Sequence, residues 1–206
     1  MELLYLTDPM CSWCYGFASV LAEVEARLPP KIPVRYVMGG LAPDSDEPMV
    51  ESTRAMVQAA WAAVERTTGA VFNHDFWTGC EPRRSTYPAC RAVLAAASLG
   101  AGREVFLGIQ RAYYQEARNP SDLDVLAAIA VEEGLDGQAF QEALSSSAIE
   151  AALTSHLAES ERVGATVGST GFPTLVLATD SGTHLLTSGY RSWPDLEPRL
   201  RELDLL

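Results

Sequence analysis

The hydrophobic pattern divides the chain into two outer regions with strand signals and a central region with helical spacing. Short apolar runs bounded by turn residues or proline predict four strands: Glu2–Thr7, Val34–Met38, Thr174–Ala178 and His184–Ser188. Alanine-rich stretches predict six helices after the second strand: Val50–Thr67, Ser85–Leu99, Arg103–Gln115, Ser121–Glu133, Asp136–Leu144 and Ser147–Val163. The turn Asp180-Ser181-Gly182 is expected to join the last two strands as a hairpin.

Two further helices are expected next to the strands. Apolar residues follow the first strand at nearly helical spacing: Ala18, Leu21, Val24 and Leu28. Pro29-Pro30 ends this helix, and Trp193-Pro194 opens a last one that runs to about Leu203. The order strand, helix, strand with short links predicts a parallel pair joined by a right-handed crossover.

The order of elements therefore predicts an α/β fold in which a helical block separates a βαβ half from an αββα half. We expect one domain with an insertion, in which residues 1–41 and 146–206 form the α/β part and residues 42–145 form a helical subdomain. Ser121, with Asp124 three residues on, and Asp136, ahead of Gly137, are the predicted caps of two inserted helices.

Charge and hydropathy exclude two classes of partner. The formal net charge is −12, and Lys31 is the only lysine, so the clustered basic residues that bind nucleic acid are missing. No apolar run reaches the roughly 18 residues of a membrane-spanning helix. Met1–Thr7 leads directly into Asp8-Pro9 without the basic and apolar regions of a secretory signal, so we expect a cytoplasmic protein.

Cys11 and Cys14 form a Cys-Ser-Trp-Cys sequence between the first strand and the first helix. At a helix start, unpaired N–H groups and the helix dipole are expected to lower the pKa of Cys11 from about 8.5 towards 7 or below. Cys14, one turn further on, is positioned to attack a mixed disulfide at Cys11. The pair therefore predicts thiol–disulfide exchange, which needs no metal and no organic cofactor.

Two other interpretations of the cysteines were weighed. A zinc site needs four ligands, and the remaining candidates are scattered: Cys80, Cys90, His74, His156 and His184. We therefore expect no metal site, and we expect the histidines to be surface or hydrogen-bonded residues. Cys11 and Cys14 could alternatively be inert buried thiols. Cys80 and Cys90 have two interpretations as well, a second, regulatory disulfide or, for Cys90 in the Ala-rich run Pro88–Ser98, a buried inert thiol.

Two motifs together resemble one family. The segment Asp8-Pro9-Met10-Cys11-Ser12-Trp13-Cys14 after the first strand, and the Gly-x-Pro segment Gly171–Val176, are similar to the DsbA/FrnE branch of the thioredoxin superfamily. The helical block matches that family's inserted domain in position and size. The resemblance implies a thioredoxin-like fold with a large all-helical insertion. It also implies a protein disulfide oxidoreductase or isomerase whose partners are protein or peptide thiols and disulfides, with glutathione as a further candidate.

The same resemblance implies roles for Phe172, Pro173 and Asp8, and Trp13 between the cysteines has a candidate role as well. The Phe172–Pro173 peptide bond is expected to be cis and to face the cysteines, with the Phe172 backbone pairing with an extended substrate beside Cys11. Trp13 is either an apolar contact for substrate or a partly buried packing residue. Asp8 is either a proton acceptor for Cys14 or, as the Asp-Pro sequence favours, a turn or helix-capping residue.

Ser12-Trp13 departs from the Pro-His pair that many oxidants of the family carry between their cysteines. Neither side chain brings positive charge, so we expect a less oxidising couple and a reductase or isomerase-like role. Arg83 or Arg84 either presents charge to a glutathione or peptide carboxylate or is an ordinary solvated arginine.

Two rival functions remain open. One is a glutathione-dependent isomerase or transferase of the hydroxychromene-carboxylate or kappa-class type, which shares the insertion but uses a serine-type site. The other is a non-catalytic, thiol-bearing chaperone that holds clients through Trp13 and Phe172.

Overall fold

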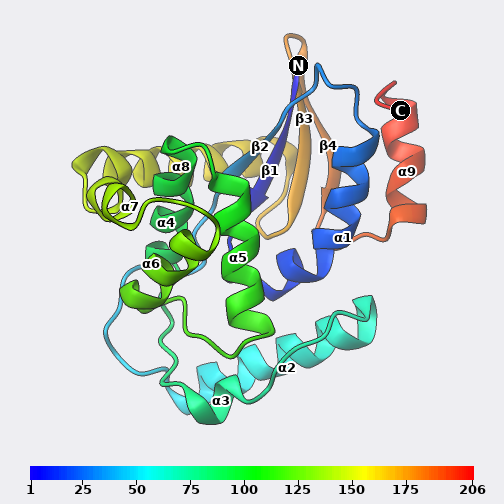
Figure 1. Cartoon of the computed structure of the whole chain (residues 1–206). Helices are drawn as coiled ribbons and strands as arrows, with labels where there is room; N and C mark the ends of the chain where they lie inside the picture. Colours follow the sequence, from blue (N-terminus) through cyan, green and yellow to red (C-terminus); the bar gives the residue numbers. More distant parts are fainter.

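The computed structural model describes all residues from Met1 to Leu206. A four-stranded sheet with the order β2-β1-β3-β4 lies at its centre (Figure 1). The strands are β1 (Glu2–Thr7), β2 (Val34–Met38), β3 (Thr174–Thr179) and β4 (Gly182–Ser188). β1 and β2 are parallel, whereas β3 runs antiparallel to both of its neighbours. All four predicted strands and the predicted parallel pair are confirmed.

Nine helices surround the sheet: α1 (Ser12–Arg27), α2 (Glu51–Thr68), α3 (Phe76–Gly79), α4 (Tyr87–Ser98), α5 (Gly102–Tyr114), α6 (Leu123–Glu132), α7 (Gly137–Leu144), α8 (Ser147–Val167) and α9 (Trp193–Glu202). Every predicted helix is present, and the short α3 is an addition. α8 runs past its predicted end to Gly168, where a left-handed backbone conformation (φ 72°) terminates it.

The two predicted caps have different outcomes. Asp136 caps α7 as expected, because its side chain accepts a hydrogen bond from the Ala139 N–H at 2.9 Å. The prediction for Ser121 is wrong: Asp122 holds the cap position of α6, and the Ser121 hydroxyl instead donates to the Ser85 carbonyl at 3.0 Å. The Ser121 hydroxyl thus bonds to the segment before α4. It does not cap α6, although the local sequence pattern predicted that it would.

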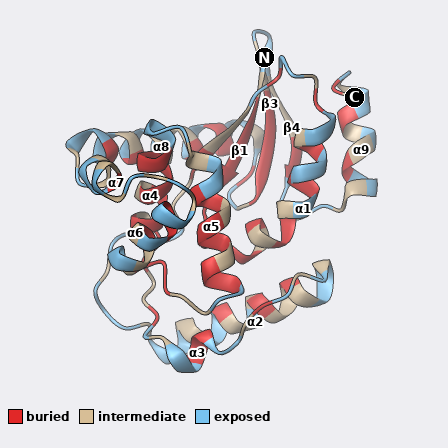
Figure 2. Ribbon diagram, viewed as in Figure 1, coloured by how far each residue is buried: buried red, intermediate tan, exposed pale blue.

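Helices cover both faces of the sheet. Leu3 and Tyr5 of β1 belong to the large core on the α1 side, whereas Leu4 and Leu6 pack with Val163 of α8 on the other side. Figure 2 shows β1 and β3 as buried strands. Burial on both faces explains why the sequences of β1 and β3 are nearly continuous apolar runs and do not alternate with polar residues.

One hydrophobic core joins the sheet to the inserted helices. A single cluster of 43 buried residues contains Tyr5 of β1, Phe17 of α1, Trp61 of α2 and Phe106 of α5. In Figure 1, α2 and α3 lie below α1 and α5, away from the N-terminus. The insertion therefore packs directly on the element that carries the Cys pair, while the exact division into 1–41 with 146–206 and 42–145 stays a prediction.

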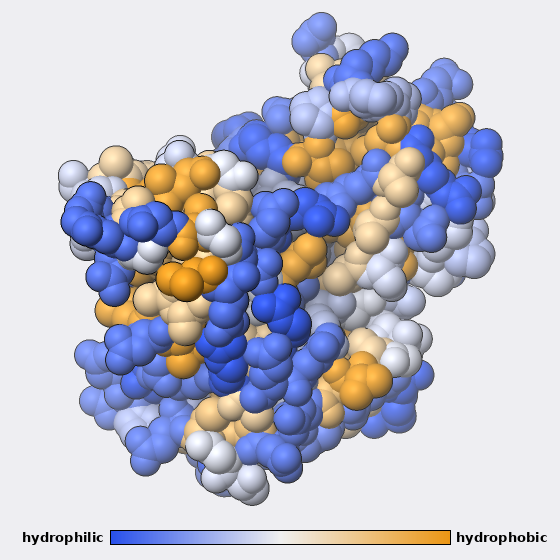
Figure 3. Space-filling model, in the orientation of Figure 1, coloured by the Kyte–Doolittle hydropathy of each residue, from blue (hydrophilic) through white to orange (hydrophobic).

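The surface is mainly polar. Figure 3 shows a face on which hydrophobic residues form separate patches among hydrophilic ones. None of the helices combines the length and the apolar character that crossing a membrane requires.

Candidate active site

The turn between β1 and α1 sets the position of Cys11. The Cys11 N–H donates to the Asp8 carbonyl at 3.0 Å, and the Met10 N–H donates to Asp8 Oδ1 at 2.7 Å. Cys11 is itself the N-cap of α1, and its Sγ accepts a hydrogen bond from the Cys14 N–H at 3.4 Å. The expected helix start at the Cys pair is therefore present, with the first cysteine as the capping residue.

The two thiols differ in access. Cys11 is 6% exposed and Cys14 is fully buried, and neither forms a disulfide in this structure. Contact with the Cys14 thiol, and then burial, raises the pKa of Cys11 well above its ordinary value, whereas the Cys14 N–H opposes this rise. The expectation of a lowered pKa is wrong for this dithiol form, because a single N–H donor is outweighed by burial and a neighbouring thiol.

The loop before β3 faces Cys11. Its Phe172–Pro173 peptide bond is cis, and the Cys11 thiol donates to the Phe172 carbonyl at 3.8 Å. This brings together residues 161 positions apart in the sequence.

Two glycines after β2 make room for aromatic rings at this loop. A Cβ on Gly39 would lie 2.0 Å from the Phe172 ring, and a Cβ on Gly40, whose φ is +59°, would lie 2.5 Å from Tyr87. Sequence reasoning treated these glycines only as the end of a strand. Their role depends on the position of the Phe172 ring, which lies far from them in the sequence, so no local pattern can reveal it.

A groove lies beside Phe172. Its volume is about 630 Å³, and the residues that line it include Gly39, Tyr87, Leu157, Ser169 and Phe172. On α1, Trp13 is half-buried, and the centroid of its ring lies 6.3 Å from the centroid of the Tyr190 ring. This contact agrees with the packing interpretation of Trp13, and its contact with substrate stays a prediction.

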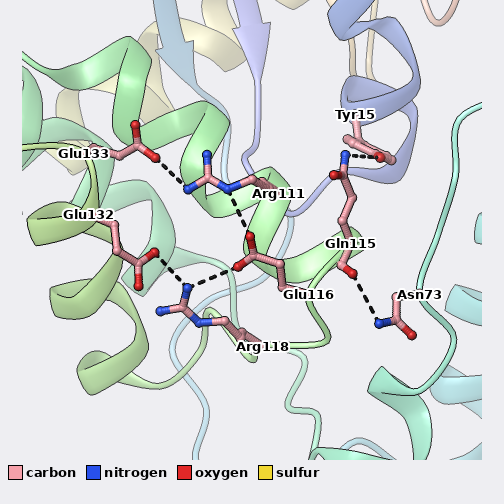
Figure 4. A network of polar contacts seen from close by, with 8 residues as sticks. All are labelled: Tyr15, Asn73, Arg111, Gln115, Glu116, Arg118, Glu132 and Glu133. Carbon is pink, nitrogen blue, oxygen red and sulfur yellow. Dashed lines mark hydrogen bonds and ion pairs between the residues drawn. The ribbon is translucent and has the colours of Figure 1, made fainter.

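A network of polar contacts holds the segment after Cys14 against the inserted helices (Figure 4). The Tyr15 hydroxyl donates to the Val71 carbonyl at 2.9 Å and accepts from Gln115 Nε2 at 2.8 Å. The Gln115 carbonyl in turn accepts from Asn73 at 3.2 Å. These bonds connect the start of α1 to the end of α5 and to the link before α3.

Asp8 is fully buried and has several partners. Its Oδ2 accepts hydrogen bonds from the Leu41 N–H at 2.7 Å and from the Thr86 hydroxyl at 2.6 Å, while its Oδ1 accepts one from the Met10 N–H. Burial raises the pKa of Asp8, and the hydrogen bonds counteract that rise. The side chain therefore organises the turn, as the Asp-Pro sequence favoured. Its action as a proton acceptor for Cys14 stays a prediction.

The other two cysteines are free thiols with separate partners. Cys90 is buried and lies 3.7 Å from Asp8 Oδ2, whereas the Cys80 thiol donates to the Ala117 carbonyl at 3.1 Å. A disulfide between Cys80 and Cys90 is therefore not formed, and burial raises the pKa of Cys90 well above its ordinary value. No group of three or more His, Cys, Asp or Glu side chains is arranged to hold a metal ion.

The remaining candidates lie outside the immediate site. His74 contacts Glu65 at 3.2 Å, and His156 Nδ1 accepts from the Met38 N–H at 3.2 Å. Arg83 is engaged by Asp122 and by the Ser121 carbonyl. Arg84 makes no ion pair. Its positive charge counteracts the rise in the pKa of Asp8, so Arg84 lies near the turn before Cys11.

Comparisons with known proteins agree with this geometry. The profile of the DSBA-like thioredoxin domain matches residues 3–201. A candidate protein disulfide isomerase from Nitrosomonas europaea is 28% identical, with a TM-score of 0.85 over 98% of this chain and 96% of that one. The cytosolic disulfide reductase DsbM from Pseudomonas aeruginosa is 31% identical, with a TM-score of 0.83 over the whole of both chains, and its structure with GSH gives a TM-score of 0.79 at 29% identity.

The curated relatives are more distant. The ClpXP adapter protein SpxH of Halalkalibacterium halodurans is 23% identical over 159 residues, which are 74% of this chain and 52% of that protein. The chain thus spans about half the length of the curated relatives that it matches. Since the family profile covers nearly all of the sequence, the chain belongs to the DSBA-like thioredoxin domain family of thiol–disulfide oxidoreductases.

Proposed function

We propose that Cys11 and Cys14 form the redox couple of this chain and that the couple reduces disulfides of small or peptide thiols in the cytoplasm. The observation that carries the proposal is the position of the Cys11 thiol. It caps α1, lies against the Phe172 carbonyl before the cis proline, and has Cys14 one turn behind it. The backbone of Phe172 can pair with an extended substrate at this point.

The exchange proceeds in two steps. Cys11, as the thiolate, attacks one sulfur of a substrate disulfide, so that a Cys11–substrate bond forms and the other substrate sulfur leaves and takes up a proton. Cys14 then loses its proton, and its thiolate attacks Cys11 Sγ. The Cys11–Cys14 bond forms, the Cys11–substrate bond breaks, and the second substrate thiol departs with a proton. Two electrons pass from the dithiol to the substrate.

The surroundings of Cys11 favour the reducing direction. A strong oxidant needs a stabilised thiolate in its reduced form. Here Ser12 and Trp13 bring no positive charge, and the Cys14 thiol and burial raise the pKa of Cys11. We therefore expect a reduction potential nearer to about −270 mV, as in thioredoxin, than to the about −120 mV of strong oxidants. An isomerase role would use the same mixed disulfide, with Cys14 as the group that releases trapped substrate.

Glutathione is the proposed small partner, supported by the related DsbM structure with GSH. Arg84, which makes no ion pair and lies near the Asp8 turn, is the candidate contact for a substrate carboxylate, because Arg83 is already engaged. The relationship to a cytosolic reductase supports the cytoplasmic location.

The deciding experiment combines insulin reduction with the redox equilibrium against glutathione. We expect Cys11→Ser to abolish reduction and Cys14→Ser to accumulate the mixed disulfide, whereas Cys80→Ser, at a half-buried thiol away from the pair, retains activity. If a Cys11–Cys14 disulfide does not form in any glutathione buffer, the proposal is wrong.

The same variants distinguish the two rivals. A glutathione-dependent isomerase or transferase would keep full activity with glutathione and an electrophile in Cys14→Ser. A non-catalytic chaperone would hold unfolded clients equally well as Cys11→Ala. We expect neither result.

A further inference from the structure

Two buried hydroxyl groups on β1 have no hydrogen-bond partner. They are the Tyr5 hydroxyl and the Thr7 hydroxyl, both on fully buried residues. Buried polar atoms are almost always paired, because leaving a hydroxyl unpaired away from water is costly. Two such groups on one strand, directly before the turn that carries Cys11, therefore need an explanation.

The Tyr5 hydroxyl lies next to the buried thiol of the redox pair. The Tyr5 ring packs 6.1 Å from that of Phe17, which follows Cys14 by three residues on the buried face of α1. The hydroxyl is close enough to Cys14 that this side chain raises the pKa of Tyr5. In the dithiol state the contact does not reach the geometry of an ordinary hydrogen bond. Thr7 lies beside the same hydroxyl.

Towards a neighbouring thiolate, the Tyr5 hydroxyl acts as a donor. Burial, and then the charge of a Cys14 thiolate, raises the pKa of Tyr5 well above its ordinary value, so the group keeps its proton when a thiol ionises. The nearby carboxylate cannot replace it, because Asp8 is engaged by Met10, Leu41 and Thr86.

The groups that face Cys14 come from three elements. Cys11 lies on the same turn of α1, Tyr5 lies on β1, and the buried Tyr114 hydroxyl, which also lacks a partner, approaches from α5. Asp8 acts on Cys11 from the turn. No basic side chain is among these groups, so the hydroxyl groups of Tyr5 and Tyr114 are the side-chain donors nearest to a charge on Cys14.

We propose that Tyr5 is a positioning residue whose unpaired hydroxyl, supported by Thr7, donates a hydrogen bond to the Cys14 thiolate during exchange. The inference rests on the proposed redox function of the Cys pair. When Cys14 attacks the mixed disulfide, its proton leaves and the hydroxyl stabilises the attacking thiolate. In the reverse reaction, an incoming thiolate bonds to Cys11, and the hydroxyl stabilises Cys14 as the leaving group. The hydroxyl is left unpaired in the dithiol because its partner exists only in these states.

The test is Tyr5→Phe, which removes one oxygen and keeps the ring against Phe17, Tyr36 and Phe106. We expect the rate at which Cys11 attacks a substrate disulfide to change by less than about twofold in this variant. The release of substrate from the mixed disulfide should slow by about tenfold or more, the effect of losing a hydrogen bond to a charged group. The pH profile of this release step should shift to higher pH, and mass spectrometry should detect accumulated mixed disulfide.

Tyr36→Phe is the matched control. Tyr36 belongs to the same aromatic cluster, but its hydroxyl is already bonded to Glu25 at 3.0 Å, away from the Cys pair. We expect both exchange steps and their pH profiles to be unchanged in this variant. Thr7→Val should slow release in the same direction as Tyr5→Phe, by a smaller factor, and it serves as the readout if Tyr5→Phe does not fold.

The possible failures are distinguishable. If the wild-type protein forms no mixed disulfide, the proposed function itself is wrong. If the wild type is active and both Tyr5→Phe and Thr7→Val release substrate at the wild-type rate with the wild-type pH profile, only the role of Tyr5 is overturned.

Discussion

The chain contains two pairs of cysteines in different environments. Cys11 and Cys14 lie at the start of α1, where one sulfur caps the helix and contacts the carbonyl before a cis proline. Cys80 and Cys90 lie in the inserted region, where one thiol bonds to a loop carbonyl and the other is buried against Asp8. Both pairs include a buried thiol, so the difference between them lies in the backbone groups and loops that face each sulfur, and not in burial alone.

Asp8 connects the two regions. Its carboxylate holds the turn before Cys11 through Met10 and Leu41, and it also contacts Thr86 and Cys90 at α4. The geometry of the Cys11–Cys14 pair therefore depends on the inserted helices, although no inserted residue belongs to the Cys-x-x-Cys sequence.

The largest expected effect follows from breaking this connection. Asp8→Ala leaves the Met10 and Leu41 N–H groups and the Thr86 hydroxyl without their acceptor. We expect a loss of about 3 kcal/mol or more in the free energy of unfolding, measured by denaturant titration. Asp44→Ala is the control, because the Asp44 side chain is 55% exposed and pairs with Arg91 at the surface, where about 1 kcal/mol or less is expected. Equal losses in the two variants would mean that Asp8 does not hold the site.

A smaller effect is expected from the loop that faces Cys11. Gly39→Ala places a methyl group against the Phe172 ring, so the ring or the loop must move. We expect a loss of about 1 to 3 kcal/mol in the free energy of unfolding. Reductase activity should fall by about tenfold or more, because a small displacement of a reacting group is costly. Gly79→Ala, at a position with open space around it, should change neither quantity. Unchanged activity in Gly39→Ala would mean that the position of Phe172 does not affect the reaction of Cys11.

The smallest predicted effect concerns the pH dependence of the thiols. Because the pKa of Cys11 is raised, its thiolate fraction at neutral pH is small and increases about tenfold per pH unit until the pKa is reached. Site-resolved alkylation by mass spectrometry should therefore show a Cys11 rate that still rises beyond about pH 8.5, where an ordinary cysteine begins to level off. Cys90, buried beside Asp8, should react only when the protein unfolds. A Cys11 rate that is constant above pH 7 would indicate a stabilised thiolate and would favour the oxidising direction instead.

The sequence alone predicted the elements that carry Cys11 and Cys14. The two central strands, β1 and β3, are recognisable because both faces of the sheet are covered there, which makes their sequences nearly continuous apolar runs. The start of α1 at Cys11 followed from the position of the Cys pair between a strand and an amphipathic helix. These features depend on residues close to one another in the chain, so a local pattern is enough to find them.

Only the tertiary structure decided how the Cys pair is surrounded. The acceptor role of Asp8 depends on Leu41 and Thr86, and the space for Phe172 depends on Gly39. The Tyr5 ring lies against Phe17 of α1 because β1 packs on that helix. The pKa of Cys11 was predicted in the wrong direction for the same reason. Helix position is a local property, whereas burial and neighbouring groups come from segments that meet only when the chain folds.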